Sequence, residues 1–76
     1  MTPDLEIDAT GLKCPLPVLR AQKALRAMAP GQVLRILASD PVAVIDLPHF
    51  CAEAGHDFLS MDETGPVPAF LIRRGI

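Results

Sequence analysis

Prolines and glycines divide this chain into six short segments, and the apolar pattern of each segment predicts its secondary structure. Over Leu5–Asp8, apolar and acidic side chains alternate, which is typical of a short half-buried strand, and Gly11 follows as a break. From about Pro15 to Met28, apolar residues return at helical spacing until a Pro-Gly pair interrupts them. The first part of the chain therefore predicts a strand followed by a helix.

The second part of the chain predicts three strands and one more helix. The aliphatic run Val33–Ala38 has the composition of a strand. Because Pro48 would disrupt a helix interior, we expect a loose turn and then a helix over Asp46–Ala54, capped by Asp46. Two final strands are expected over Phe58–Asp62 and Ala69–Arg73, joined by a turn-rich segment. The predicted order is βαβαββ.

This order predicts a two-layer α/β (α+β) sandwich, in which a mixed four-stranded sheet carries both helices on one face. Residues 1–76 are expected to form a single domain, because no linker or internal repeat is visible. If the first two strands are parallel, the turns that contain Cys14 and Asp40 lie at the same edge of the sheet.

Composition narrows the classes of function. Two cysteines are too few for the disulfide framework of a small secreted domain, and the N-terminus lacks the features of a signal peptide. We therefore expect a cytoplasmic protein with no membrane partner. A net charge of −2 argues against direct binding of nucleic acid.

The charges are unevenly distributed along the chain. From Ala9 to Ser39 every charged residue is basic, and from Asp40 to Ile72 every charged residue is acidic. Ordinary solvated faces explain such runs in most proteins. Near Cys14, however, Arg20 and Lys23 are candidates for docking an acidic partner surface.

Cys14 is the candidate reactive residue. It directly precedes the predicted helix, so its sulfur is expected near unpaired amides and the positive end of the helix dipole, with Lys13 alongside. These neighbours predict a lowered thiol pKa. Pro15 and Pro17 stiffen the first turn without losing hydrogen bonds, which leaves the Leu16 amide free to stabilise an anion.

The residues alone leave two interpretations of Cys14 open: a reactive thiol, or a small buried apolar side chain. No histidine is predicted beside it, which argues against hydrolytic cysteine chemistry. Transfer of sulfur between thiols needs only a thiolate and access. Asp40 is expected to cap a helix next to Cys14, whereas Cys51 is expected in the core. We expect no metal site and no cofactor.

The segment around Cys14 is also the most distinctive motif of the chain. It reads Asp8-Ala9-Thr10-Gly11-Leu12-Lys13-Cys14-Pro15-Leu16-Pro17, and it is followed by Pro30-Gly31, Ser39-Asp40-Pro41, Asp46-Leu47-Pro48, Phe50-Cys51, Gly55-His56 and Leu71-Ile72-Arg73-Arg74. In order and spacing, this pattern resembles the TusA/SirA-like sulfur-carrier family over essentially the whole chain.

The resemblance implies a carrier that accepts sulfane sulfur as a persulfide on Cys14. The donor would be a cysteine desulfurase or a rhodanese-like protein, and the recipient a downstream relay protein, as in 2-thiolation of the wobble uridine of tRNA or a related pathway. The resemblance also implies a supporting role for Asp40. Leu16 departs from relatives that have an acidic residue between the two prolines, which bears on the choice of partner.

Two other functions are compatible with the sequence. A regulatory or interaction module could keep this fold without sulfur chemistry, and a redox switch would require a Cys14–Cys51 disulfide. The resemblance implies a sulfurtransferase-type carrier that acts by persulfide transfer rather than a stand-alone turnover enzyme.

Overall fold

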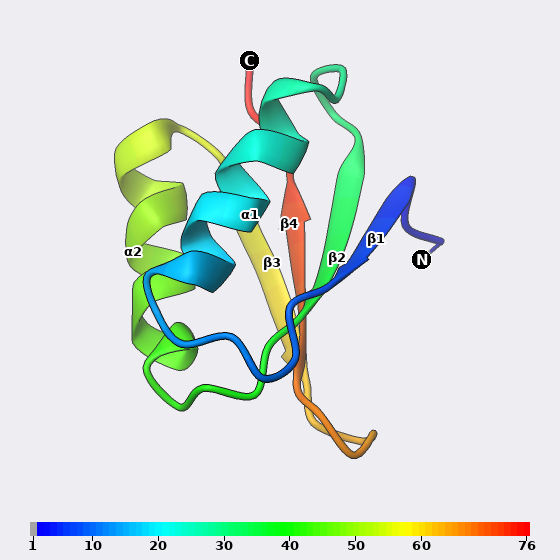
Figure 1. Ribbon diagram of the computed structural model, residues 1–76. Coiled ribbons are helices and arrows are strands. Elements are labelled where there is room, and N and C mark those ends of the chain that lie inside the picture. Colours follow the sequence, from blue (N-terminus) through cyan, green and yellow to red (C-terminus); the bar gives the residue numbers. More distant parts are fainter. Residues whose placement is uncertain (1) are drawn as a thin grey trace.

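A mixed four-stranded sheet carries two helices on one of its faces (Figure 1). The computed structural model describes residues 2–76. In chain order, the elements are β1 (Leu5–Asp8), α1 (Leu16–Arg26), β2 (Val33–Leu37), α2 (Ala43–Ala54), β3 (Asp57–Asp62) and β4 (Ala69–Arg73). This is the predicted two-layer α+β sandwich with the order βαβαββ.

The sheet has the strand order β1-β2-β4-β3. Strands β1 and β2 are parallel, with Leu5 opposite Leu34 and Ile7 opposite Ile36. Strand β4 is antiparallel to both of its neighbours. Since β1 and β2 run the same way, the loops that follow them, which contain Cys14 and Asp40, emerge at the same edge of the sheet.

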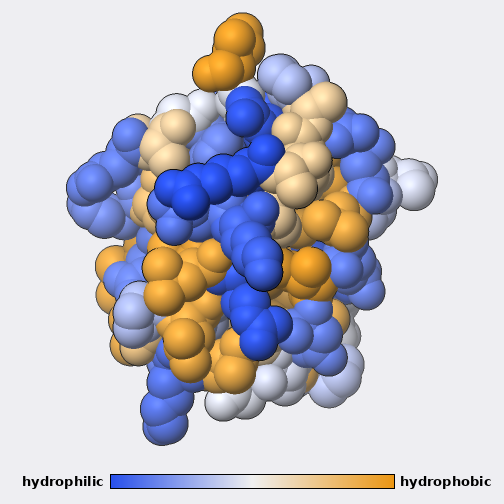
Figure 2. Space-filling view, turned by 45° about the horizontal axis from the view of Figure 1, so that its top comes forward, coloured by the Kyte–Doolittle hydropathy of each residue, from blue (hydrophilic) through white to orange (hydrophobic). Residues whose placement is uncertain are grey.

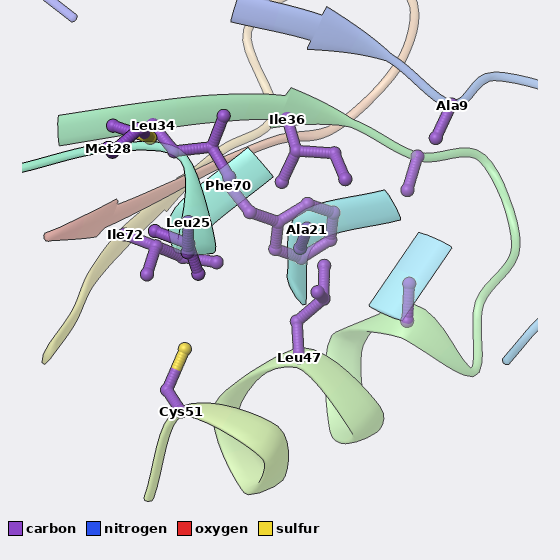
Figure 3. Close-up of a cluster of buried hydrophobic side chains, with 12 residues drawn as sticks. Ala9, Ala21, Leu25, Met28, Leu34, Ile36, Leu47, Cys51, Phe70 and Ile72 are labelled. Atoms are coloured by element: carbon purple, nitrogen blue, oxygen red, sulfur yellow. The ribbon is translucent and has the colours of Figure 1, made fainter. Parts of the chain in front are cut away.

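The hydrophobic core fills the space between the helices and the sheet (Figure 3). Its fully buried side chains include Leu34 and Ile36 of β2, Phe70 and Ile72 of β4, Leu25 of α1, and Leu47 and Cys51 of α2. In the close-up, Leu47 and Cys51 point from α2 toward the sheet. The prediction that Cys51 belongs to the core is confirmed.

Helix α1 is shorter at both ends than the range from Pro15 to Met28 that the sequence predicts. Its C-terminal end is tightened, because the amides of Ala27 and Met28 donate to carbonyls only three residues back, at 3.1 Å each. Periodicity in the sequence therefore continues past the last regular α-helical turn.

Helix α2 begins at Ala43, three residues before the predicted start at Asp46, and it includes Pro48. The prediction of a loose turn there was wrong. Pro48 removes the hydrogen bond to the carbonyl of Val44, a residue of the first turn that is exposed to solvent. The helix nevertheless continues through this position to Ala54.

Truncation of Leu34 tests the core. We expect Leu34→Ala to lower the free energy of unfolding by about 2–5 kcal/mol, because it leaves a cavity under both helices. Leu5→Ala is a matched control: Leu5 lies opposite Leu34 on the edge strand and is 39 % exposed. Its expected cost is about 1 kcal/mol or less. Urea unfolding followed by circular dichroism measures both values, and equal losses would contradict this description of the core.

Candidate functional site

Cys14 lies in the loop between β1 and α1, where its side chain is half-buried and packs against the core cluster. The helix begins at Leu16, with Pro15 as its cap residue, so Cys14 stands one residue further from the helix than the sequence predicts. The Leu16 amide donates to the carbonyl of Lys13 at 2.9 Å. It is therefore not free to bind the sulfur, contrary to expectation.

Two side chains of the β2–α2 loop fasten the Cys14 loop in place. One oxygen of Asp40 accepts a hydrogen bond from the Cys14 amide at 2.9 Å, and its other oxygen accepts one from the Val42 amide at 3.0 Å. The Ser39 hydroxyl accepts a bond from the Gly11 amide at 2.8 Å. The structure thus places Asp40 beside Cys14, where the parallel strands predict it, and gives it a clamping role between the two loops.

The electrostatic environment of Cys14 differs from the expectation. Desolvation and the nearby carboxylates of Asp46 and Asp40 raise the pKa of the Cys14 thiol to about 11. The predicted lowering of the thiol pKa was wrong, because burial and the two carboxylates raise that pKa. The hydrogen bonds from the Val42 and Cys14 amides lower the pKa of the Asp40 carboxyl. The positive charge of Lys13 acts in the same direction.

Asp46 is the residue of this site that sequence reasoning missed. The sequence suggests only a helix-capping role, whereas in the structure its carboxylate is one of the groups that raise the pKa of the Cys14 thiol. Asp46 falls in the first turn of α2 and is half-buried there. Its position could have indicated this role, because Asp46 lies one helical turn after Ala43, at the edge that Cys14 and Asp40 share.

Several apolar side chains at the starts of the two helices are exposed to solvent. Leu16 and Leu19 on α1 are 47 % and 50 % exposed, and Val42 and Ile45 at the start of α2 are 48 % and 72 % exposed. We call these four residues the apolar rim. Pro17, in contrast, is a buried residue of the first turn of α1, while Pro15 is exposed. The two prolines of the motif therefore have different surroundings.

The predicted docking residues Arg20 and Lys23 lie further along α1. They border a shallow hollow between α1 and β1 that Ile7 and Ala24 help to line. Figure 2 shows a band of strongly hydrophilic side chains crossing this side of the molecule between apolar areas. Within residues 2–76, neither cation forms an ion pair. Both remain available to an acidic surface.

The two histidines are occupied away from Cys14. His49 pairs with Glu53 at 2.7 Å, and the Nδ1 atom of His56 accepts the Gly75 amide at 2.9 Å. Across residues 2–76, no group of three or more His, Cys, Asp or Glu side chains could hold a metal ion. No helix in the same part of the chain is long and apolar enough to cross a membrane.

Comparison with known proteins places this chain in a family. The sequence model described as Sulfurtransferase TusA matches residues 5–74. The chain belongs to the TusA family. It is 46 % identical over 71 residues to the sulfur carrier protein TusA of Allochromatium vinosum, covering 93 % of each chain. The crystal structure of a SirA-like protein from Desulfitobacterium hafniense has a TM-score of 0.81 and 29 % identity, over 95 % of this chain and 99 % of that one.

The Asp40 clamp predicts a dependence of stability on pH. Since folding lowers the pKa of Asp40, its ionised form stabilises the fold above the pKa of the unfolded chain, and that contribution is lost as the pH falls through the lower folded pKa. We expect Asp40→Asn to be less stable than the wild type at neutral pH and to lose less stability between about pH 5 and pH 2. Urea unfolding across this pH range measures both effects, and identical profiles for the two proteins would contradict the clamp.

Proposed function

We propose that this protein is a sulfur carrier that holds sulfane sulfur as a persulfide on Cys14. The observation that carries the proposal is the 46 % identity to a sulfur carrier across 93 % of both chains. The site is compatible with it, because Cys14 is only half-buried, has no disulfide partner and lies at an edge that a partner can reach. On this proposal, residues 1–76 act as one carrier domain.

The transfer is an exchange between a thiol and a persulfide. The Cys14 thiolate attacks the outer sulfur of a donor persulfide, a new bond forms between Sγ and that sulfur, and the sulfur–sulfur bond of the donor breaks. The donor cysteine leaves with the electron pair and takes up the proton that Cys14 has lost. The exchange needs no added oxidant or reductant, and the reverse sequence at an acceptor cysteine releases the cargo.

The proposed donor is a cysteine desulfurase or a rhodanese-like protein, and the proposed acceptor is a downstream relay protein, as in tRNA wobble-uridine 2-thiolation or a related pathway. A reducing compartment such as the cytoplasm suits a carrier whose two cysteines are both free. We assign Asp40 to support of the Cys14 loop, Leu16 to the partner contact, and Lys13, Pro15 and Pro17 to the shape and charge of the turn.

Loading with sulfur tests the carrier function. After incubation with a cysteine desulfurase and L-cysteine, we expect the intact mass of the wild type to increase by one sulfur atom, in a form that dithiothreitol removes. Cys14→Ser is expected to gain nothing, whereas Cys51→Ser should load as the wild type does, because Cys51 is buried. Absence of the added sulfur on the wild type, or equal loading of Cys14→Ser, would refute the proposal.

Charge reversal tests the docking role of α1. We expect Arg20→Glu combined with Lys23→Glu to slow loading by the desulfurase about tenfold at low salt and less at high salt, because steering by exposed charges is screened. Arg26→Glu is the control, since Arg26 lies on the same helix but does not border the hollow between α1 and β1. If the control slows loading as much as the double variant, net charge and not a local contact controls the reaction.

One observation favours a second candidate, an interaction module without sulfur chemistry. A thiol pKa of about 11 leaves little thiolate at neutral pH in the free protein. The two candidates differ in their dependence on Cys14. For the module, Cys14→Ala should keep every binding partner and complement a deletion strain, whereas the carrier hypothesis predicts loss of complementation.

A further inference from the structure

A hollow of about 270 Å³ lies between the C-terminal turns of α1 and α2 and the segment that follows β4. Its lining includes Gln22 and Arg26 of α1, Phe50 and Ala54 of α2, and His56 and Arg74. In Figure 1, these ends of the two helices lie at the opposite end of the molecule from the β1–α1 loop. The hollow is therefore separate from the site at Cys14.

The positive charge of this hollow is not neutralised. Arg26 and Arg74 both line it, and none of the described residues in its lining is acidic. Within residues 2–76, neither arginine forms an ion pair. Glu53 and Asp57, which adjoin lining residues in the sequence, form ion pairs with residues outside the lining. Two guanidinium groups thus share one concave surface without a carboxylate.

The guanidinium group of Arg74 is held in a fixed orientation. Its Nε atom donates to the carbonyl of Leu25 at 3.0 Å, and its Nη1 atom donates to the carbonyl of Gly75 at 2.6 Å. A guanidinium has five N–H donors, so three remain, and two of them are on Nη2. In the part of the chain that the structure describes, Nη2 has no hydrogen-bond partner. The group can therefore bind an anion with little further loss of side-chain freedom.

His56 adds a neutral donor to the lining. Its Nδ1 atom accepts the Gly75 amide at 2.9 Å, so the neutral ring carries its proton on Nε2. Desolvation and the charge of Arg74 lower the pKa of His56, while the charge of Asp57 opposes them. The hollow thus combines two cations with one N–H donor, and these groups come from three separate segments of the chain.

We propose that this hollow binds a phosphate group through Arg26, Arg74 and His56. A phosphate group carries a charge of about −1.5 to −2 at neutral pH, which balances two arginines, whereas a carboxylate carries a single negative charge. Its oxygens also point in several directions, so they can accept from donors on three segments, and arginine pairs with two of them at once.

The phosphate group has two possible sources. One is free inorganic phosphate, and the other is a phosphate monoester whose organic part packs against the half-buried ring of Phe50. The binding chemistry of the phosphate is the same for both. Contact with the ring would add affinity only for the monoester.

A simpler role for the two arginines is to stabilise the end of α1, where cations interact favourably with the helix dipole. The bond from Arg74 to the Leu25 carbonyl is a contact of this kind. The two roles predict different measurements. A purely structural role changes the melting temperature without any ligand, but it produces no saturable binding of phosphate.

The test is a titration of the isotope-labelled, full-length protein with inorganic phosphate at about pH 7.5, followed through amide chemical shifts. Sodium chloride at the same ionic strength measures screening, and sodium acetate measures binding of a carboxylate. Phenyl phosphate is the probe for a monoester. The four titrations together separate a phosphate site from a general response to salt.

Three variants accompany the titrations. Arg26→Gln is the main variant, because Arg26 is exposed and its replacement should leave the fold intact. Arg74→Gln is measured in parallel. Arg35→Gln is the matched control, because it removes the same charge from β2, where Arg35 pairs with Glu6 outside the hollow.

We expect phosphate to shift the amides of Ala27, His56 and Gly75 saturably, with a Kd of about 1–10 mM. Arg26→Gln and Arg74→Gln should weaken binding about five- to tenfold, because each removes charge-assisted hydrogen bonds. Arg35→Gln should stay within about twofold of the wild type. Tighter binding of phenyl phosphate than of inorganic phosphate identifies a monoester as the ligand, and equal or weaker binding identifies the free anion.

Several results would overturn the proposal: no saturation with phosphate, the same shifts with chloride, equal affinity for acetate, or an equal loss in Arg35→Gln. Circular dichroism verifies the fold of each variant. If Arg74→Gln does not fold, the affinity of Arg26→Gln decides the test. The outcome is independent of the carrier function, because phosphate binding is measured without any sulfur donor.

Discussion

The parallel pairing of β1 with β2 is the constraint on which the site depends. It brings two loops that are 26 residues apart in the chain to one edge of the sheet, where the Asp40 carboxylate joins them. The pairing itself depends on the core, because Leu34 and Ile36 of β2 are fully buried beneath the helices. In this small chain without disulfides, the register of β1 with β2 and the Asp40 carboxylate thus hold the Cys14 loop in place.

The arrangement also determines the chemistry that Cys14 can perform. Burial against the core and two nearby carboxylates favour a protonated thiol, and no histidine is bonded to it as a base. A site of this kind suits exchange with a sulfur that a partner delivers, and it does not suit hydrolysis. In the free protein, Cys14 is mostly a protonated thiol. On the proposed function, a reactive sulfur anion forms at Cys14 when a partner docks or when Cys14 carries the transferred sulfur.

Much of the fold follows from local patterns in the sequence. Alternating residues in β1 and the aliphatic run of β2 identify both strands, and their parallel pairing predicts that Asp40 lies near Cys14. The start of α2 could not be predicted from the rule about proline, because the cost of Pro48 depends on whether the carbonyl it leaves unpaired reaches water. The thiol pKa was mispredicted for a related reason. Helix position can be inferred from sequence, but burial and the approach of Asp46 are tertiary properties.

The apolar rim has a consequence for the fate of the cargo. Its four side chains come from the starts of both helices, beside the loop that holds Cys14. A partner surface that buries them gains free energy from the burial and, in the same contact, shuts water and small thiols away from the sulfur atom in transit. On the proposed carrier function, one contact over these residues would both bind the partner and keep water away from the transferred sulfur.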